Sequence, residues 1–226
     1  ARFINRVGKE ADAAQRMGAY RLVDRLGAGG MGEVWTAKHD LLVRPAAVKL
    51  IRPEMLGGPA GIETALLRFE REAQATAALR SPHAIQVFDF GTTDDGVFYY
   101  VMELLEGMDL DQLIRHSGPM PAERVVSVLR QVCRALQDAE SNGLVHRDIK
   151  PANIFCCRLG PHVDFVKVLD FGLVKPLTAA NAQLTADNVV SGTPAFLAPE
   201  AAMGQVDHRT DLYALGCVAY WMLTGT

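Results

Sequence analysis

The sequence has little cysteine, no long apolar run and no marked excess of charge of one sign. Its 226 residues include four cysteines, none of which forms a C-x-x-C pair or a His/Cys cluster with zinc spacing. We therefore expect idle or buried thiols in a reducing, cytoplasmic setting. No apolar stretch approaches the length of about 18 residues that is needed to cross a bilayer, and no secretory signal is visible.

Charge and composition narrow the class of protein further. The formal net charge is −3, and both signs are spread along the chain without a basic stripe, which argues against a nucleic-acid-binding protein. Apolar residues make up 49% and charged residues 22%, a globular composition. The length suits one large domain or two small lobes. Because the chain begins with alanine and stops just after a strongly apolar stretch, we expect a fragment of a longer protein.

The first half of the chain reads mainly as strands. Residues 1–19 show no period and are expected to be a linker or a frayed helix. Strands are predicted at 20–26, 33–38 and 45–51, and a hairpin joins 85–90 to 97–102 across Asp94-Asp95-Gly96. One amphipathic helix is predicted over 62–79 from the helical spacing of Leu66, Phe69, Ala73 and Ala77, and Ser81-Pro82 ends it.

The second half reads mainly as helices. A helix is predicted over 121–142, with Asn142-Gly143 as its C-cap, and a buried helix over 207–224. Short strands flank 154–169. We therefore predict an α+β fold of two lobes. Its parts are a linker at 1–19, a small antiparallel N-lobe at 20–102, a hinge at 103–107 and an incomplete, mostly helical C-lobe at 108–226.

A glycine-rich segment lies between the first two predicted strands. Residues 27–34 read Gly-Ala-Gly-Gly-Met-Gly-Glu-Val, a G-x-G-x-x-G-x-V spacing. Glycines let the backbone approach phosphate oxygens closely and adopt positive φ. A strand follows this segment, whereas a dinucleotide-binding fold needs a helix there. Taken alone, the segment is either a phosphate-binding loop or a flexible hairpin without a ligand.

A lysine on the third predicted strand is a candidate phosphate ligand. Lys49 ends the run Ala46-Ala47-Val48-Lys49, and its ammonium group would be a point charge facing phosphates. A solvated strand lysine is the alternative interpretation. We choose Glu72 on the following helix as its carboxylate partner, and Glu70 and Glu63 remain competitors.

The segment 146–153 is the most specific motif of the chain. It reads His-Arg-Asp-Ile-Lys-Pro-Ala-Asn, and Asp170-Phe171-Gly172 follows. Phosphoryl transfer needs a carboxylate that orients the attacking hydroxyl, metal ligands, and positive charge on the moving group. We assign the first role to Asp148, Mg²⁺ binding to Asn153 and Asp170, and the γ-phosphate contact to Lys150.

Together these motifs resemble the eukaryotic-like (Hanks-type) serine/threonine protein kinases of bacteria. The resemblance runs from about Tyr20 to the last residue, and Ala198-Pro199-Glu200 completes the family's ordered set. It implies ATP and Mg²⁺ as cofactors and protein substrates that carry serine or threonine. It also implies that Asp211 ties the late helix to the catalytic loop.

The resemblance implies further nucleotide contacts. Met102 corresponds to the gatekeeper, and Glu103 and Leu105 to the backbone partners of adenine. Other residues would enclose the adenine ring or cover the phosphates, and these are Leu26, Gly27, Ala28, Gly29, Gly30, Met31, Gly32, Glu33, Val34, Ala47, Phe155 and Leu169.

Regulation and hydroxyl class are also implied by the resemblance. Lys150 and Gly192-Thr193-Pro194 are typical of serine/threonine kinases. An activation-loop phosphate would pair with Arg147, and Thr185 is our first choice for the phosphorylated residue, with Thr193 among the alternatives. The family also forms dimers through the N-lobe, and some members are anchored in a membrane by a later segment.

Two departures and two alternative functions accompany this interpretation. Ala46 and Phe196 replace a valine and a tyrosine that are common in relatives. A pseudokinase scaffold would bind ATP without turnover, but Lys49, Asp148 and Asp170 are all present. A small-molecule kinase would resemble H-G-D rather than H-R-D and would lack the Ala-Pro-Glu motif.

Overall fold

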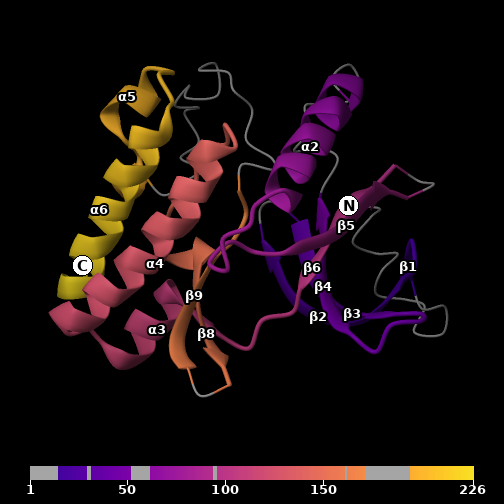
Figure 1. Ribbon diagram of the computed structural model, residues 1–226, viewed down its shortest axis with the longest axis horizontal. Helices are drawn as coiled ribbons and strands as arrows, with labels where there is room; N and C mark the ends of the chain where they lie inside the picture. The colour runs from indigo at the N-terminus through magenta and orange to yellow at the C-terminus, as the bar shows by residue number, and fades with distance from the viewer. Residues whose placement is uncertain (1–14, 30–31, 52–61, 94–95, 161, 172–193) are drawn as a thin grey trace. The chain divides into compact units, whose positions relative to one another are not determined.

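The structure is a computed structural model, and it describes residues 15–29, 32–51, 62–93, 96–160, 162–171 and 194–226 (Figure 1). The chain divides into two compact units. The first comprises Ala1–Glu63 with Val87–Leu104, and the second comprises Thr64–Gln86 with Leu105–Thr226. This division differs from the predicted lobes in one segment, because residues 64–86 group with the second unit. The predicted lobe boundaries stay a prediction.

An antiparallel sheet of six strands forms the first unit. Its order is β1-β2-β3-β4-β6-β5, and all of its pairings are antiparallel. The strands are β1 (Arg16–Met17), β2 (Tyr20–Gly29), β3 (Gly32–His39), β4 (Pro45–Ile51), β5 (Val87–Thr92) and β6 (Phe98–Glu103). The three strands and the hairpin predicted from the sequence are confirmed. The linker prediction is wrong at its end, because Arg16 pairs with Arg21 and Met17 is buried in the sheet.

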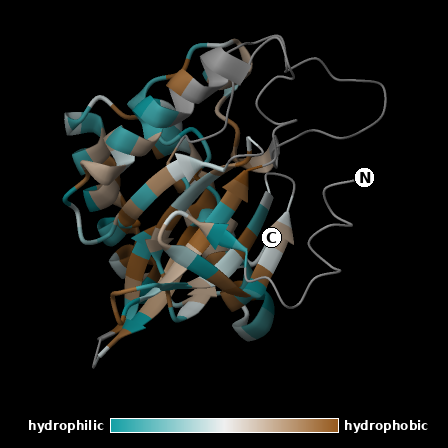
Figure 2. Cartoon of the chain, turned by 90° about the vertical axis from the view of Figure 1, so that its right-hand side faces the viewer, coloured by the Kyte–Doolittle hydropathy of each residue, from teal (hydrophilic) through white to brown (hydrophobic). Residues whose placement is uncertain are grey.

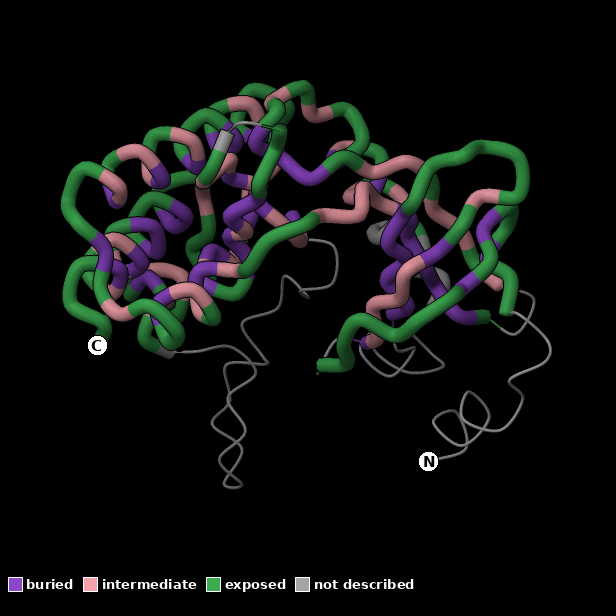
Figure 3. The backbone as a smooth tube through the Cα atoms, turned by 90° about the horizontal axis from the view of Figure 1, so that it is seen from below, coloured by how far each residue is buried: buried purple, intermediate pink, exposed green. Residues whose placement is uncertain are grey.

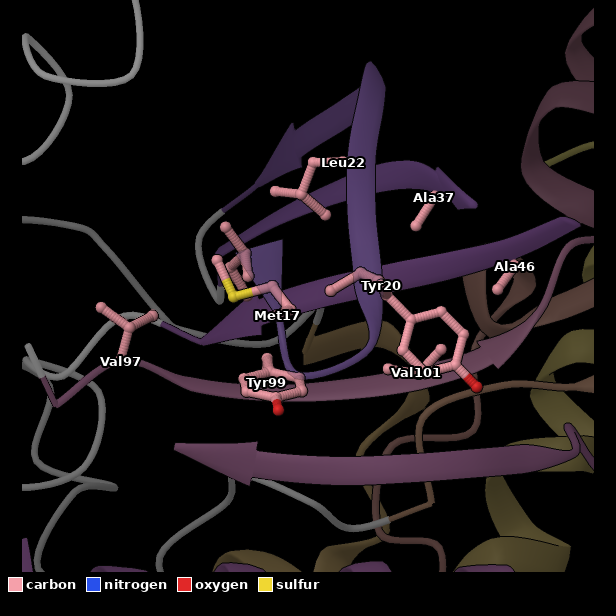
Figure 4. Close-up of a cluster of buried hydrophobic side chains, with 10 residues drawn as sticks. Met17, Tyr20, Leu22, Ala37, Ala46, Val97, Tyr99 and Val101 are labelled. Carbon is pink, nitrogen blue, oxygen red and sulfur yellow. The ribbon is translucent and has the colours of Figure 1, made fainter. Parts of the chain in front are cut away.

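The core of the first unit consists of side chains from one face of this sheet. Apolar residues concentrate in its strands (Figure 2), and ten buried residues make up the cluster drawn in Figure 4. Nine of them come from β1, β2, β3, β4 and β6, and Val97 lies just before β6. The ten are Met17, Tyr20, Leu22, Ala37, Ala46, Val48, Leu50, Val97, Tyr99 and Val101. Because successive side chains of a strand point to opposite faces, the remaining side chains of these strands face away from this cluster.

The second unit is mainly helical and carries a small three-stranded sheet. Helix α2 (Ile62–Ala77) enters this unit at Thr64. The sheet has the order β7-β8-β9. The remaining elements are β7 (Gly107–Asp109), α3 (Leu110–Ser117), α4 (Ala122–Ser141), β8 (Ile154–Leu159), β9 (His162–Val168), α5 (Pro199–Ala202) and α6 (His208–Thr224). The helices predicted at 62–79, 121–142 and 207–224 are confirmed with slightly shorter bounds.

Helix α3 was not predicted, although its sequence carries a start signal. Asp109 is its N-cap, and the Asp109 carboxylate accepts a hydrogen bond from the backbone N–H of Gln112. Leu110 and Ile114 are the buried positions, and Gly118 ends the helix with φ 77°. Eight residues give only three apolar positions at helical spacing, Leu110, Leu113 and Ile114, too few for a periodic pattern to stand out.

Helix α6 is apolar on nearly all sides but buried on only one. Buried and exposed residues alternate along the helices of the second unit (Figure 3). In α6 the buried face includes Ala214, Leu215, Val218 and Met222. Its exposed apolar residues are Leu212, Tyr213, Tyr220 and Leu223. The prediction of a buried helix therefore holds for one face of α6 among the described residues.

The four cysteines are free thiols in the described part of the chain. Cys156 and Cys157 are buried in β8, Cys217 is half-buried, and Cys133 is exposed. Burial raises the pKa of Cys156 to about 12, with a further contribution from the nearby Asp164 carboxylate. A thiol with so high a pKa is a poor nucleophile, which agrees with the prediction of idle thiols. Within the described residues, no helix has the length and apolar character needed to cross a membrane.

A buried carboxylate joins α6 to the loop that precedes β8. Asp211 lies in the first turn of α6 and is 4% exposed. Its two oxygens accept the backbone N–H groups of His146 and Arg147, both at 2.8 Å. Burial raises the pKa of Asp211, while His146 and the two hydrogen bonds oppose this shift. The tie predicted for Asp211 is therefore formed.

We predict that Asp211→Ala destabilises the protein strongly. The substitution leaves two backbone N–H groups without an acceptor, which should lower the free energy of unfolding by about 2–5 kcal/mol. Urea denaturation of the two proteins measures the difference. Arg209→Ala, an exposed change in the same helical turn, is the control and should have little effect. An unchanged unfolding midpoint for Asp211→Ala would contradict the prediction.

Candidate active site

Lys49 is a buried cation at the centre of the first sheet. It lies on β4, paired with Val34 on β3 and with Tyr100 on β6. Lys49 is 8% exposed, and its Nζ atom lies 5.8 Å from the centroid of the Tyr100 ring, within cation–π range. A lysine this buried is not the solvated strand lysine that the sequence left open. Tyr100 is a neighbour that the sequence did not reveal, because only strand pairing brings it beside Lys49.

The glycine-rich segment includes the end of β2 and the start of β3. Gly29 pairs with Gly32, and Gly27 with Val34, while Gly30 and Met31 lie outside the described residues. Gly32 has φ 150°, and a Cβ there would collide with the carbonyl oxygen of Leu50. Only glycine fits this position, because the β4 backbone passes directly against it. The described residues of the segment therefore lie on two paired strands, which agrees with both interpretations of its sequence.

The side chain of Asp148 lies among two donors of its own loop, residues 144–153. Lys150 Nζ donates to Asp148 Oδ2 at 2.9 Å, and Asn153 Nδ2 donates to the same oxygen at 3.0 Å. Asn153 Nδ2 also donates to the Asp148 carbonyl oxygen at 2.8 Å. The Asp148 side chain is 10% exposed. Three residues that the sequence selected for catalysis are thus brought together, with Asp148 oriented from two sides.

His146 connects this loop to the residue before Asp170. Its Nδ1 accepts the N–H of Asp148 at 3.2 Å, so the ring proton is on Nε2, which donates to the Leu169 carbonyl oxygen at 2.7 Å. His146 is fully buried, and its ring lies 4.7 Å from that of Phe171. The sequence singled out His146 only as part of the motif, and the structure gives it this connecting role.

Asp170 has a backbone conformation that is uncommon outside glycine. Its φ is 56°, in the left-handed region. Neighbours hold this conformation, because Leu169 N donates to the Asn153 carbonyl oxygen at 2.9 Å and Phe171 is fully buried. Such conformations persist where the surroundings determine them, often at functional sites.

Asn153 and Asp170 have the chemistry of a Mg²⁺ site. Because Nδ2 of Asn153 makes two donor contacts to Asp148, its Oδ1 atom is the one that suits a cation. Mg²⁺ prefers one or two such oxygen ligands together with waters and phosphate oxygens. Among the described residues there is no cluster of three or more His, Cys, Asp or Glu that could hold a metal by itself. The donor set therefore fits an ion bound jointly with a phosphate.

Glu72 makes an ion pair within the second unit. Its Oε1 atom lies 3.6 Å from Nη1 of Arg147, and the two side chains are 13% and 25% exposed. The pair predicted between Glu72 and Lys49 joins the two units and stays a prediction. Sequence reasoning did not anticipate the contact with Arg147, for which no local spacing rule exists.

The other predicted site residues divide between the units or fall outside the described residues. Leu26, Val34, Ala47, Met102 and Glu103 belong to the first unit. Leu105, Phe155 and Leu169 belong to the second, so a joint adenine site stays a prediction.

Two regulatory candidates cannot be compared with the structure. Thr185 and Thr193 lie outside the described residues, in the interval 172–193.

Comparison with known proteins identifies the family. Residues 20–226 match the protein kinase domain. The chain is 41% identical over 209 residues to the serine/threonine-protein kinase pkn3 of Myxococcus xanthus, covering 91% of this chain and 38% of that protein. It is 40% identical over 210 residues to PknB of Mycobacterium tuberculosis strain H37Rv, covering 91% and 32%.

A solved structure agrees with the sequence relatives. The kinase domain of Mycobacterium tuberculosis PknI is similar with a TM-score of 0.76 and 29% identity, covering 96% of this chain and 79% of that one. The chain spans 38% of the length of pkn3 and 32% of the length of PknB, about a third of each of these curated relatives. Its fold is the two-lobed α+β fold expected from the motifs. The chain belongs to the protein kinase family.

Proposed function

We propose that the protein is a serine/threonine protein kinase that transfers the γ-phosphoryl group of ATP to protein hydroxyls. The observation that carries this proposal is the hydrogen-bonded group of Asp148, Lys150 and Asn153. It holds a carboxylate, a cation and an amide oxygen in the arrangement that phosphoryl transfer needs. The named relatives are serine/threonine-protein kinases, which supports the same hydroxyl class.

Asp148 has the role of orienting the substrate hydroxyl. The hydroxyl oxygen attacks the γ-phosphorus, the bond to the bridging oxygen of ADP breaks, and the hydroxyl proton passes to the Asp148 carboxylate. Lys150, 2.9 Å from that carboxylate, is close enough to shift its ammonium group to the transferred phosphoryl oxygens. These two side chains therefore supply the base and part of the positive charge that the reaction requires.

Lys49 and the Asn153–Asp170 pair are assigned to the rest of the nucleotide. Lys49 would leave its site beside the Tyr100 ring to neutralise phosphate oxygens, a modest rearrangement for a flexible side chain. Asn153 and Asp170 would hold Mg²⁺, which neutralises the charge of the phosphates when bound. The adenine contacts of Met102, Glu103 and Leu105 and a dimer through the N-lobe remain part of this proposal only as expectations.

We predict that Asp148→Asn abolishes most of the turnover while nucleotide binding survives. The amide cannot take the hydroxyl proton, so kcat should fall by about 100-fold or more. Transfer of radioactive phosphate from ATP to a generic protein substrate measures turnover, and calorimetry measures ATP binding, both with the full-length protein. Asp111→Asn, in the exposed pair with Arg115, is the matched control.

Either of two results would contradict the proposal. Turnover by Asp148→Asn equal to that of the unchanged protein rejects the role of Asp148. ATP binding without turnover in the unchanged protein instead supports a pseudokinase scaffold.

Regulation through Arg147 is a second part of the proposal. Arg147 Nε is buried and has no hydrogen-bond partner among the described residues. A buried guanidinium donor favours an additional anionic partner, and a phosphate can supply several acceptor oxygens. We assign that phosphate to Thr185, which would then compete with Glu72 for Arg147.

We predict that the active full-length protein carries phosphate on Thr185 after incubation with ATP. Mass spectrometry of the autophosphorylated protein locates the modified residue. Thr185→Ala should lower substrate phosphorylation, whereas Thr178→Ala, in the same interval, should not. A protein that autophosphorylates elsewhere, with Thr185 unmodified, rejects this assignment.

A further inference from the structure

We propose that Asp138, in the last turn of α4, is a positioning residue for phosphoryl transfer. It holds the segment that follows α2, residues 78–86, and thereby fixes the end of α2, the helix that carries Glu72, and the end of β9 that leads to Asp170. The inference rests on the proposed kinase function. It assigns a role to a residue outside the motifs of the sequence, which gave no reason to select it.

The Asp138 side chain makes two short contacts with this segment. Its Oδ2 atom accepts the backbone N–H of Arg80 at 2.7 Å and that of Ser81 at 2.8 Å. Its Oδ1 atom lies 3.5 Å from Nδ2 of Asn142. One carboxylate oxygen thus binds two consecutive amides that are more than fifty positions away in sequence, which joins two distant parts of the chain.

Asp138 supplies a hydrogen-bond acceptor for two amides of the segment that find none within it. Past the end of α2, most backbone N–H groups find acceptors in α2, in the segment or in β9. Those of Ala78, Leu79, His83, Ala84 and Ile85 donate to Gln74 O, Thr76 O, Ser81 Oγ, Ser81 O and Val168 O, respectively. Pro82 has no N–H. The amides of Arg80 and Ser81 are the two in this stretch that receive a side-chain acceptor from another element, so their satisfaction depends on Asp138.

The far end of the segment is attached to β9. Val168 N donates to the His83 carbonyl oxygen at 2.7 Å, and Ile85 N donates to the Val168 carbonyl oxygen at 2.9 Å. His83 Nδ1 lies 3.0 Å from the Val166 carbonyl oxygen. This attachment is made just before Leu169 and Asp170. The segment is therefore held at two points, one on α4 and one on the strand that leads to the proposed metal ligand.

Helix α2 transmits the position of this segment to Glu72. Glu72 lies little more than one helical turn before the end of α2 at Ala77, and its carbonyl oxygen accepts the Thr76 hydroxyl at 2.8 Å. Its carboxylate is 3.6 Å from Arg147 Nη1. A helix moves as a stiff rod over such a distance, so release of its C-terminal end displaces the Glu72 carboxylate.

The placement of an acid here runs against the local preference of a helix. The last turn of α4 contains no basic residue, whereas the partial negative charge of a helix C-terminus favours one and disfavours an aspartate. The two amide contacts offset that preference. A residue that breaks a local rule and makes compensating tertiary contacts is a candidate for a positional role.

Asp138→Ala in the full-length protein tests the inference with two independent readouts. Hydrogen exchange of peptides covering 78–86 should become faster, because the amides of Arg80 and Ser81 lose their acceptor. At a temperature well below unfolding, kcat should fall by between about 10- and 100-fold, with a smaller change in the KM for ATP. Asp138→Asn keeps an acceptor oxygen and should restore most of both properties. Glu140→Ala, an exposed change in the same turn, is the matched control.

The outcomes separate this inference from the proposed function. Unchanged exchange in Asp138→Ala, or faster exchange with unchanged kcat, overturns the positioning role while the kinase function stands. An Asp138→Asn protein as impaired as Asp138→Ala also overturns it. Absence of turnover in the unchanged protein rejects the kinase function instead. If Asp138→Ala does not fold, Asp138→Glu replaces it, because the longer side chain displaces the carboxylate but retains its charge.

Discussion

The arrangement of the proposed catalytic loop depends on one buried carboxylate. Asp211 accepts the N–H groups of His146 and Arg147 and so fixes the start of the loop to the first turn of α6. From that point His146 reaches Leu169, and Asn153 reaches both Asp148 and Leu169. Asp148 and Leu169, the residue before Asp170, are thereby held by one network of hydrogen bonds.

Asp138 and Asp211 use the same chemistry at two places. Each carboxylate accepts two consecutive backbone N–H groups of a segment far away in sequence. Asp211 is deeply buried, and its desolvation raises its pKa, whereas Asp138 is only half-buried. Irregular backbone satisfies only some of its own amides, so a loop that must keep one conformation needs acceptors from neighbouring elements. Both loops that approach the proposed site meet this need with an aspartate from a helix.

Much of the fold could be predicted because its signals are local. Strand-like runs of residues located β2, β3 and β4, and helical spacing located α2 and α4. The short elements escaped prediction, because β1 consists of Arg16 and Met17 alone and α3 spans only Leu110–Ser117. Two residues become a strand only when a partner strand supplies their hydrogen bonds. Helix α6 shows the same limit, since its apolar composition could not tell which face is buried.

The sequence by itself determined the family and predicted the candidate catalytic groups, because phosphoryl transfer demands particular residue types at short, ordered spacings. Asp148, Lys150 and Asn153 are close in the chain, so their association follows from one loop. Only the tertiary structure placed Tyr100 beside Lys49, Arg147 beside Glu72, and Asp138 beside Arg80 and Ser81. Contacts of this kind join residues that are tens of positions apart. No local pattern encodes them, because they arise from how whole elements pack.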